Sequence, residues 1–183
     1  DNGSTDGTAE TVRASFPDVR LIVNRDNLGF SRGSNQGIRE AAGRYIALLN
    51  NDTEIRENAF RKVVTFLEEH PDVGAAGPRL YNPEGTVQES ALKTFITIPS
   101  ALFGGQLLAR LGRRLPPPLR PFPEMVLVTH ERNEVEEVAW LTGACIVIRR
   151  KTLEEIGLLD ENIFMYCEDM EWCYRAGRAR WKI

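Results

Sequence analysis

The sequence has few of the residues that disulfide frameworks, metal clusters and nucleic-acid surfaces require. Its three cysteines, Cys145, Cys167 and Cys173, are odd in number and form no C-x-x-C pair, which predicts free thiols in a reducing compartment. Its two histidines have no partner at metal-ligand spacing. The formal net charge of -3 predicts no general attraction to nucleic acid. No run of about 18 apolar residues exists, so no membrane span is expected in this stretch.

What remains is the composition of an ordinary globular domain, with 42% hydrophobic and 27% charged residues among 183. This length suits one domain with a sizeable core. The chain opens on D-N-G-S and closes on W-K-I, and we interpret both ends as cut from a longer protein.

Helix and strand patterns alternate along residues 1–80. Helices are expected at 9–16, 31–42 and 58–69, with Thr5 or Asp6 capping the first and Gly43 ending the second. Strands are expected at 19–24, 45–49 and 73–76. Residues 45–49 are a continuous apolar run, which is typical of a strand buried on both faces. Short connections between alternating elements predict a parallel, doubly wound α/β sheet.

The second half has a different organisation. We expect a turn at 81–85, a strand at 138–148 that is interrupted at 142–144, a helix at 151–156 ended by Gly157, and a helix at 168–176. Residues 107–115, with Arg110, Arg113 and Arg114, admit two interpretations. We favour a solvated loop helix over an amphipathic, peripheral contact with a membrane.

Two polar turns follow strand ends, where α/β sheets bind ligands. In residues 1–8, D-N-G-S-T-D-G-T, small residues let a ligand approach the backbone and the next helix N-terminus favours anions. A capped turn without a ligand explains this pattern equally well. In residues 50–53, N-N-D-T, a carboxylate is available to Mg²⁺ or Mn²⁺. The residue types there, taken alone, favour a helix cap.

Two further motifs lie in the second half. Glu168 and Asp169 begin a helix whose dipole should keep both carboxylates ionised, and an ionised carboxylate can take a proton from an attacking hydroxyl. Acids are also common in first helical turns for structural reasons, which this pattern alone favours. In W-L-T-G-A at 140–144, Gly143 indicates a bulge or a close ligand, and Trp140 is either a sugar-stacking residue or part of the core.

In this order, the motifs resemble those of the family 2 inverting glycosyltransferases, in particular the rhamnosyltransferase-like members. The matching stretches are D-N-G-S-T-D-G-T, N-x-G-F-x-x-x-x-N-x-G at 27–37, Y-I-A-L-L-N-N-D-T, W-L-T-G-A-C-I-V-I-R-R and F-M-Y-C-E-D-M-E-W-C-Y-R. They span nearly the whole chain except about residues 90–134. The resemblance implies a GT-A fold, which is a Rossmann-like, mostly parallel sheet flanked by helices, here without its N-terminal strands.

The resemblance also implies a division of one domain over residues 1–183. Residues 1–80 would form the nucleotide-binding part, and residues 81–183 the acceptor and catalytic part, with a variable loop at about 90–134. The implied partners are a nucleotide-diphosphate sugar donor, a divalent metal (Mg²⁺ or Mn²⁺) and a saccharide or lipid-linked saccharide acceptor. The implied setting is bacterial cell-surface polysaccharide synthesis, in the cytoplasm or at the inner face of the cell membrane.

Roles for single residues follow from the same resemblance. Asp169 resembles the catalytic base, with Glu168 beside it in the acceptor pocket, and Asp52 resembles the remaining carboxylate of the D-x-D metal site. The residues implied to bind the nucleotide-sugar are Asp1, Asn35, Asn50, Asn51, Asp52, Trp140, Gly143 and Ala144. This assignment requires Asp1, Asp52 and Asp169 to meet around one cleft.

The chain departs from the family pattern in two places. Asn50 stands where the family has the first Asp of D-x-D, and the family's first two strands would precede Asp1, one of them beside residues 45–49. We therefore expect poor donor binding or incomplete folding from residues 1–183 alone. Two other functions stay open: a sugar nucleotidyltransferase, which would share the α/β core and the metal carboxylate, and a catalytically inactive nucleotide-sugar-binding module.

Overall fold

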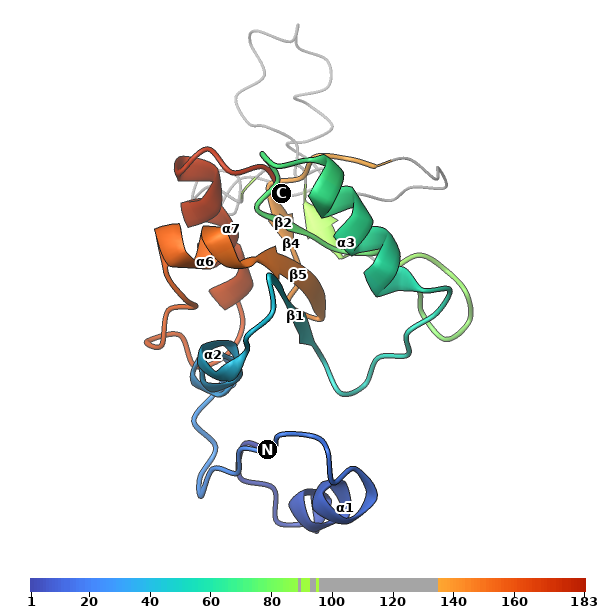
Figure 1. Cartoon of the computed structure of the whole chain (residues 1–183), viewed down its shortest axis with the longest axis vertical. Helices are drawn as coiled ribbons and strands as arrows, with labels where there is room; N and C mark the ends of the chain where they lie inside the picture. The colour runs from blue at the N-terminus through green and yellow to red at the C-terminus, as the bar shows by residue number, and fades with distance from the viewer. Residues whose placement is uncertain (89, 93–94, 96–134) are drawn as a thin grey trace, which may run out of the picture.

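The computed structural model describes residues 1–88, 90–92, 95 and 135–183 (Figure 1). The helices are α1 (Thr8–Ser15), α2 (Phe30–Glu40), α3 (Ala59–Glu69), α6 (Arg150–Ile156) and α7 (Glu168–Arg178). The strands are β1 (Tyr45–Leu49), β2 (Ala75–Ala76), β3 (Ala91–Leu92), β4 (Trp140–Leu141) and β5 (Cys145–Arg149). The expected segment at 107–115 and most of the variable loop at 90–134 lie outside the described residues. Within the described part, no helix is long and apolar enough to cross a membrane.

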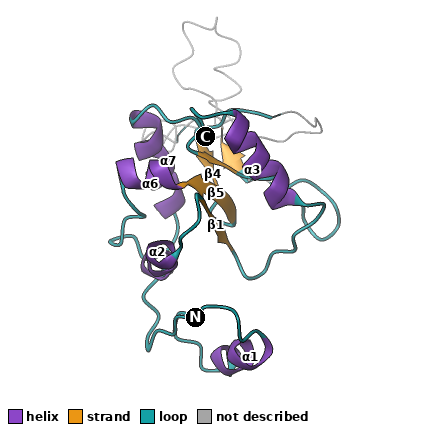
Figure 2. Ribbon diagram, viewed as in Figure 1, coloured by secondary structure: helices purple, strands orange, loops and turns teal. Residues whose placement is uncertain are grey.

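The central sheet has the strand order β1-β5-β2, and β5 runs antiparallel to both neighbours. β3 and β4 form a separate antiparallel pair. Helix α3 covers one face of the central sheet, and α2, α6 and α7 lie on the other (Figure 2). The α/β class is confirmed, but the described strands do not pair in parallel as expected. β1 and β2 are parallel to each other, and β5, from the far half of the sequence, lies between them.

Strand β5 is the centre of the core. Ile146 and Ile148 pack with α2, α6 and α7, while Val147 packs on α3 with Val63 and Leu67. Burial of such a side chain contributes about 1.5–3 kcal/mol. The prediction that residues 45–49 are buried on both faces is wrong, because β1 is at the edge of the described sheet and Leu49 is 43% exposed.

Three arginines join the elements of this core by donating to carbonyls in the last turn of a helix or just after it. Cationic side chains are favourable there because the last carbonyls of a helix lack partners and carry partial negative charge. Arg149 donates to Leu67 in the last turn of α3 and to His70 after it. Arg150 donates to Ala41 and Gly43 after α2, and Arg175 to Ile156, the last residue of α6, and to Leu158. Helix α2 therefore ends at Glu40, earlier than Gly43, where the sequence placed its end.

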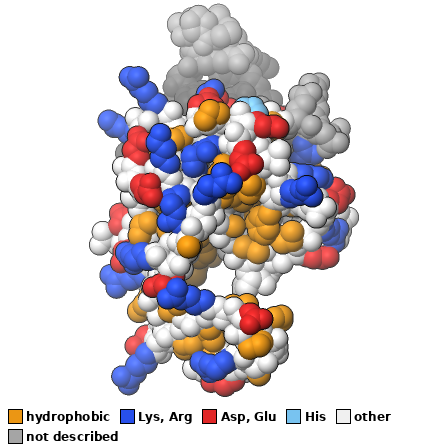
Figure 3. Space-filling view, in the orientation of Figure 1, with side chains coloured by type: hydrophobic (Ala, Val, Ile, Leu, Met, Phe, Trp, Pro, Cys, Tyr) orange, Lys and Arg blue, Asp and Glu red, His pale blue; other side chains and the backbone are white. Residues whose placement is uncertain are grey.

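Residues 1–24 form a small lobe that includes α1 and joins the rest through a narrow waist (Figure 3). The strand expected at 19–24 does not form. The backbone of Asp1 bonds to Ile22 O (2.7 Å) and Asn24 N (2.9 Å), but Val19 and Val23 are exposed. No described strand lies beside this segment, so its β-favouring residues have no sheet to join.

Several local predictions are confirmed. The turn at 81–85 closes an Asn82–Thr86 backbone bond, and Gly85 has φ 87°. The strand interrupted at 142–144 is β4 followed by β5. Gly157 ends α6 with φ 87°. All three cysteines are free thiols, and burial raises the pKa of Cys173 to about 12.

Candidate functional site

The turn Thr142-Gly143-Ala144 carries the chain from β4 in one sheet to β5 in the other. Gly143 is buried, and its N–H donates to Asp169 Oδ2 at 2.6 Å. The other oxygen of this carboxylate, Oδ1, accepts from Met170 N at 2.7 Å. Each carboxylate oxygen has two lone pairs, so both keep capacity for one more proton or donor. Asp169, half-buried, is thus fixed in direction before any ligand arrives.

Two other motif segments reach the same turn. The backbone N of Asn50 donates to Ala144 O at 2.9 Å, which fixes the loop after β1. On the other side, a Cβ added to Gly143 would lie 3.5 Å from both Asp169 Oδ2 and the ring of Phe30. Gly143 therefore lies between the carboxylate and the first residue of α2, at normal contact distance from each.

Asn2 connects the N-terminal motif to this cluster, a role that we did not predict. Its Nδ2 donates to Asn27 Oδ1 and Gly29 O, both at 3.0 Å, and its Oδ1 accepts from Leu28 N at 3.1 Å. Gly29 directly precedes Phe30, so these bonds place the N-terminal turn beside the start of α2. The shared asparagines of D-N-G-S and N-x-G-F were the available signal.

Asp1 itself closes its own turn. Its carboxylate accepts from Ser4 N at 3.2 Å and Ser4 Oγ at 2.5 Å. Among the described residues, no contact joins the carboxylates of Asp1, Asp52 and Asp169. The segments of Asp52 and Asp169 meet the Thr142–Ala144 turn through Asn50 and Gly143, whereas Asn2 joins the segment of Asp1 to residues 27–29 before α2. A shared cleft for the three carboxylates stays a prediction.

The loop after β1 presents Asn51 and Asp52 to solvent. Asp52 has no hydrogen bond or ion pair within the described part of the chain, while Thr53 Oγ1 donates to Asn50 O at 2.7 Å. The helix-cap explanation for this loop is wrong, because α3 begins only at Ala59 and its cap residue is Asn58. No group of three or more His, Cys, Asp or Glu side chains in the described ranges is placed to hold a metal.

Glu168 differs from its neighbour. It is 5% exposed, and its Oε2 is buried without a partner among the described residues. Burial raises the pKa of Glu168, and the adjacent Asp169 raises it further, although the backbone N–H of Glu168 lowers it. Loss of hydration at Glu168 therefore opposes the stabilisation of its ionised form that we expect from the helix dipole.

The side chains of Asn35 and Trp140 contact other parts of this chain. Asn35 is 1% exposed; its Nδ2 donates to Leu159 O (2.9 Å) and Glu161 Oε1 (3.0 Å), and its Oδ1 accepts from Leu159 N (3.1 Å). This amide fastens α2 to the segment before α7, and the contact of Asn35 with the donor stays a prediction. Trp140 packs against the main core, as in the second of its two interpretations.

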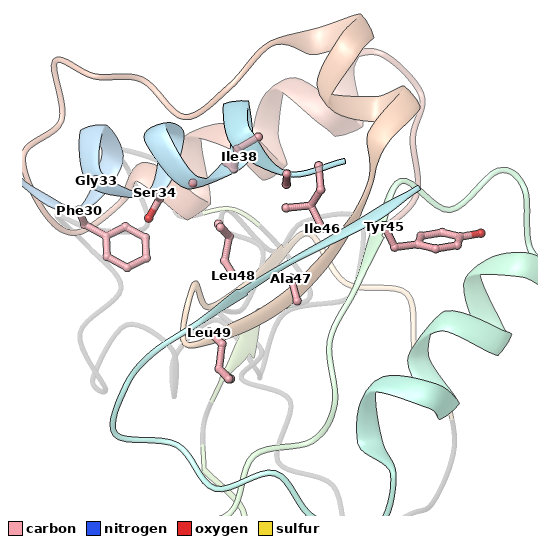
Figure 4. Close-up of a pocket in the computed structure, with 11 residues that line it drawn as sticks. Phe30, Gly33, Ser34, Ile38, Tyr45, Ile46, Ala47, Leu48 and Leu49 are labelled. Atoms are coloured by element: carbon pink, nitrogen blue, oxygen red, sulfur yellow. The ribbon is translucent and has the colours of Figure 1, made fainter. Parts of the chain in front are cut away.

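A groove of about 420 Å³ runs between α2 and the outer edge of β1. Ile46 and Leu48 point from β1 toward α2, whereas Ala47 and Leu49 point away (Figure 4). Phe30 closes the end of the groove nearest Gly143, so the groove and the carboxylate site share this ring.

Comparison with known proteins identifies the family. The family described as "Glycosyl transferase family 2" matches residues 1–157. The chain belongs to glycosyltransferase family 2. It is 33% identical over 195 aligned positions to a Mycobacterium tuberculosis protein named "N-acetylglucosaminyl-diphospho-decaprenol L-rhamnosyltransferase", covering 99% of this chain and 60% of that protein. It is 31% identical to a low-salt glycan biosynthesis hexosyltransferase of Haloferax volcanii, covering 92% of this chain and 50% of the relative.

The chain thus spans only part of the length of these family 2 relatives. A solved structure with the same fold is a mannosyltransferase from Pyrobaculum calidifontis in complex with GDP-Man and Mn²⁺. The TM-score is 0.55 at 18% identity, and the match covers 94% of this chain and 39% of that one. This match confirms the GT-A fold.

Proposed function

We propose that this chain is the donor- and acceptor-binding part of an inverting glycosyltransferase. The observation that carries the proposal is the Asp169 carboxylate, which two backbone amides fix beside the turn where the family motifs meet. A base must be held in one direction to take a proton efficiently, and this carboxylate is held before a substrate binds.

The proposed reaction is a single displacement. Asp169 takes the proton of the acceptor hydroxyl while the oxygen of that hydroxyl bonds to the anomeric carbon of the donor sugar. The bond from that carbon to the diphosphate breaks on the opposite side, and the nucleoside diphosphate leaves with the electron pair. Glu168, whose pKa is raised by burial, would lie beside Asp169 in the acceptor pocket.

The loop after β1 fits a divalent cation such as Mg²⁺ or Mn²⁺. Asp52 and Asn51 are exposed there, and carboxylate and amide oxygens suit hard cations. A cation held by Asp52 would neutralise charge on the departing diphosphate. Asp52 supplies only one carboxylate, so phosphate oxygens and water would complete the coordination of the cation. Asp1, Asn50, Gly143 and Ala144 would line the donor side.

We further propose a lipid-linked saccharide acceptor in cell-surface polysaccharide synthesis, at the cytoplasmic face of the membrane. Support comes from the diphospho-decaprenol acceptor in the name of the mycobacterial relative and from a Myxococcus xanthus relative named as an O-antigen biosynthesis protein. The latter is 29% identical and covers 93% of this chain.

The test uses the full-length protein. Thermal shifts with Mg²⁺ or Mn²⁺ select a donor from nucleotide-activated rhamnose, GDP-mannose and UDP-N-acetylglucosamine. The chosen donor is then incubated with N-acetylglucosaminyl-diphospho-polyprenol. We expect release of nucleoside diphosphate and a product of inverted anomeric configuration. Release of pyrophosphate would indicate a nucleotidyltransferase instead, and donor binding without any transfer would indicate a binding module.

A further inference from the structure

An exposed apolar segment lies directly before the two acids of α7. Phe164, Met165 and Tyr166, here called the 164–166 patch, are 57%, 48% and 78% exposed. Tyr166 is three residues before Asp169, so their Cα atoms are at most about 11 Å apart. The proposed chemistry leaves these side chains without a role.

The fold holds this patch in place at both ends. Phe164 O accepts from Phe30 N at 2.7 Å, and Gly29 packs so tightly against Phe164 that an added Cβ would lie 2.5 Å from its carbonyl oxygen. At the other end, Cys167 O accepts from Glu171 N at 2.9 Å and begins the bonding of α7. The patch is therefore a fixed surface of the site.

The backbone is strained at the last residue of the patch and at the residue that follows it. Tyr166 has φ 68° and Cys167 has φ 69°, the left-handed region that non-glycine residues rarely adopt. Such residues persist where the surroundings impose them, and they cluster at ligand sites. Here the strained backbone holds an exposed aromatic side chain three residues before the proposed base, an exposure that folding alone does not favour.

Charge distinguishes between two partners, a sugar and a membrane. Residues 160–171 contain no lysine or arginine. The arginines that contact this segment are paired: Arg39 with Glu161 at 2.7 Å, Arg32 with Glu161 at 4.0 Å and Arg175 with Glu171 at 2.6 Å. A membrane-binding loop needs free cations for anionic headgroups, whereas a sugar needs an apolar ring face with polar groups at its rim. Tyr166 and the neighbouring acids provide the second arrangement.

We propose that Tyr166 stacks on a pyranose ring of the acceptor and so presents the acceptor hydroxyl to Asp169. This inference rests on the proposed function and names the acceptor side of the same site. Phe164 and Met165 extend the apolar surface under the ring, and the tyrosine hydroxyl bonds to sugar hydroxyls at its edge.

The test compares Tyr166→Ala, Tyr166→Phe and Tyr166→Gly in the full-length protein, with Tyr81→Ala, another exposed tyrosine (55%), as the matched control. For Tyr166→Ala we expect about a tenfold higher acceptor KM, equivalent to about 1.4 kcal/mol, with unchanged donor Kd. Tyr166→Phe should keep most of the affinity. Tyr166→Gly should have a Tm at least equal to wild type, because glycine accepts this φ, yet the same acceptor defect.

Direct binding separates this inference from the proposed function. Saturation-transfer NMR with methyl N-acetylglucosaminide should show contacts that Tyr166→Gly loses and Tyr81→Ala keeps. If the wild type transfers no sugar but this difference persists, the proposed function fails and the stacking role stands. Unchanged acceptor KM and unchanged NMR contacts in both Tyr166→Ala and Tyr166→Gly would overturn the inference. Reduced binding of Tyr166→Ala to anionic phosphatidylglycerol vesicles, with saccharide binding intact, would overturn it in favour of a membrane contact.

Discussion

Two carboxylates of the family motifs differ in burial and in hydrogen bonding. Asp169, half-buried, accepts from two backbone amides, whereas Asp52 is exposed and has no partner within the described part of the chain. A carboxylate with a fixed direction can serve chemistry as soon as a hydroxyl arrives. A carboxylate without partners can move to meet a cation and its phosphates. Position in a motif therefore does not show whether a carboxylate is already held in one direction or is free to move toward its ligand.

The largest effect is expected from Asp169→Asn in the full-length protein. The amide cannot take the acceptor proton, so kcat should fall about 10²–10⁴-fold, the usual contribution of a general base. Donor Kd should change little. Both oxygens of Asp169 accept from N–H groups, so the new NH₂ must face one of them, and a small decrease in Tm should accompany the loss. Rates of nucleoside diphosphate release and calorimetry of the donor measure these quantities.

Asp18→Asn, at an exposed carboxylate of the N-terminal lobe, is the matched control for Asp169→Asn and should behave as wild type. Acceptor glycosylation that persists in Asp169→Asn would remove the base from the proposal. It would favour a function in binding alone.

The buried amide of Asn35 extends the comparison to a motif residue with no free polar group. Asn35→Ala leaves the N–H and C=O of Leu159 unpaired inside the protein. The free energy of unfolding should therefore fall by about 2–3 kcal/mol, measured by urea titration. In the folded protein, donor Kd should match wild type.

Asn51→Ala is the control, because Asn51 is exposed. It should leave stability unchanged. If Asn35→Ala weakened donor binding at unchanged stability, that result would support the predicted contact of Asn35 with the donor.

Sequence patterns predicted the helices and strands better than they predicted which strands pair with each other. Periodicity placed α7 correctly because a helix bonds within a few residues, and the apolar run at 45–49 gave the bounds of β1. It missed β5 as the central strand, since pairing joins residues about a hundred positions apart and leaves no local pattern. The strand expected at 19–24 failed for the same reason: its residues favour a sheet, but a strand also needs a neighbour.

The site was predictable to a similar degree. The motifs identified which segments matter, and the structure brings the loop after β1, the start of α2 and Asp169 to the Thr142–Ala144 turn. Burial was not readable from the motifs, so the enclosed surroundings of Asn35 and Glu168 were not predicted. The role of Asn2 depends on bonds to residues 27–29, which no spacing within the first motif predicts.

Asp52→Asn tests the adaptable side of the comparison and should have an intermediate effect. If Asp52 holds a divalent cation, the metal-dependent part of donor affinity should fall about tenfold. Stability should not change, because Asp52 has no partner to lose among the described residues. Donor titrations with Mn²⁺ and with EDTA measure this difference.

Glu54→Gln is the control on the same loop, since the Glu54 side chain is 77% exposed and pairs only with Arg56 among the described residues. It should retain the metal response. Equal donor affinity of Asp52→Asn and wild type in Mn²⁺ would mean that the cation, if bound, is held elsewhere.

The smallest effect is expected from Glu168→Gln, and it is a pH dependence. Burial raises the pKa of Glu168 above its ordinary value of 4.5, so the folded state holds this proton more tightly than the unfolded state. The stability that this contributes is fully present below the unfolded pKa and is lost as the pH rises through the raised folded pKa. Glutamine cannot ionise and escapes this loss. Urea midpoints of Glu168→Gln and wild type should therefore be similar at about pH 4 and should separate in favour of the variant at about pH 8.

Glu154→Gln, at an exposed position of α6, should follow wild type at both pH values. Parallel pH curves for Glu168→Gln and wild type would show that the folded chain ionises Glu168 without penalty, and the contrast between the two acids of α7 would then disappear.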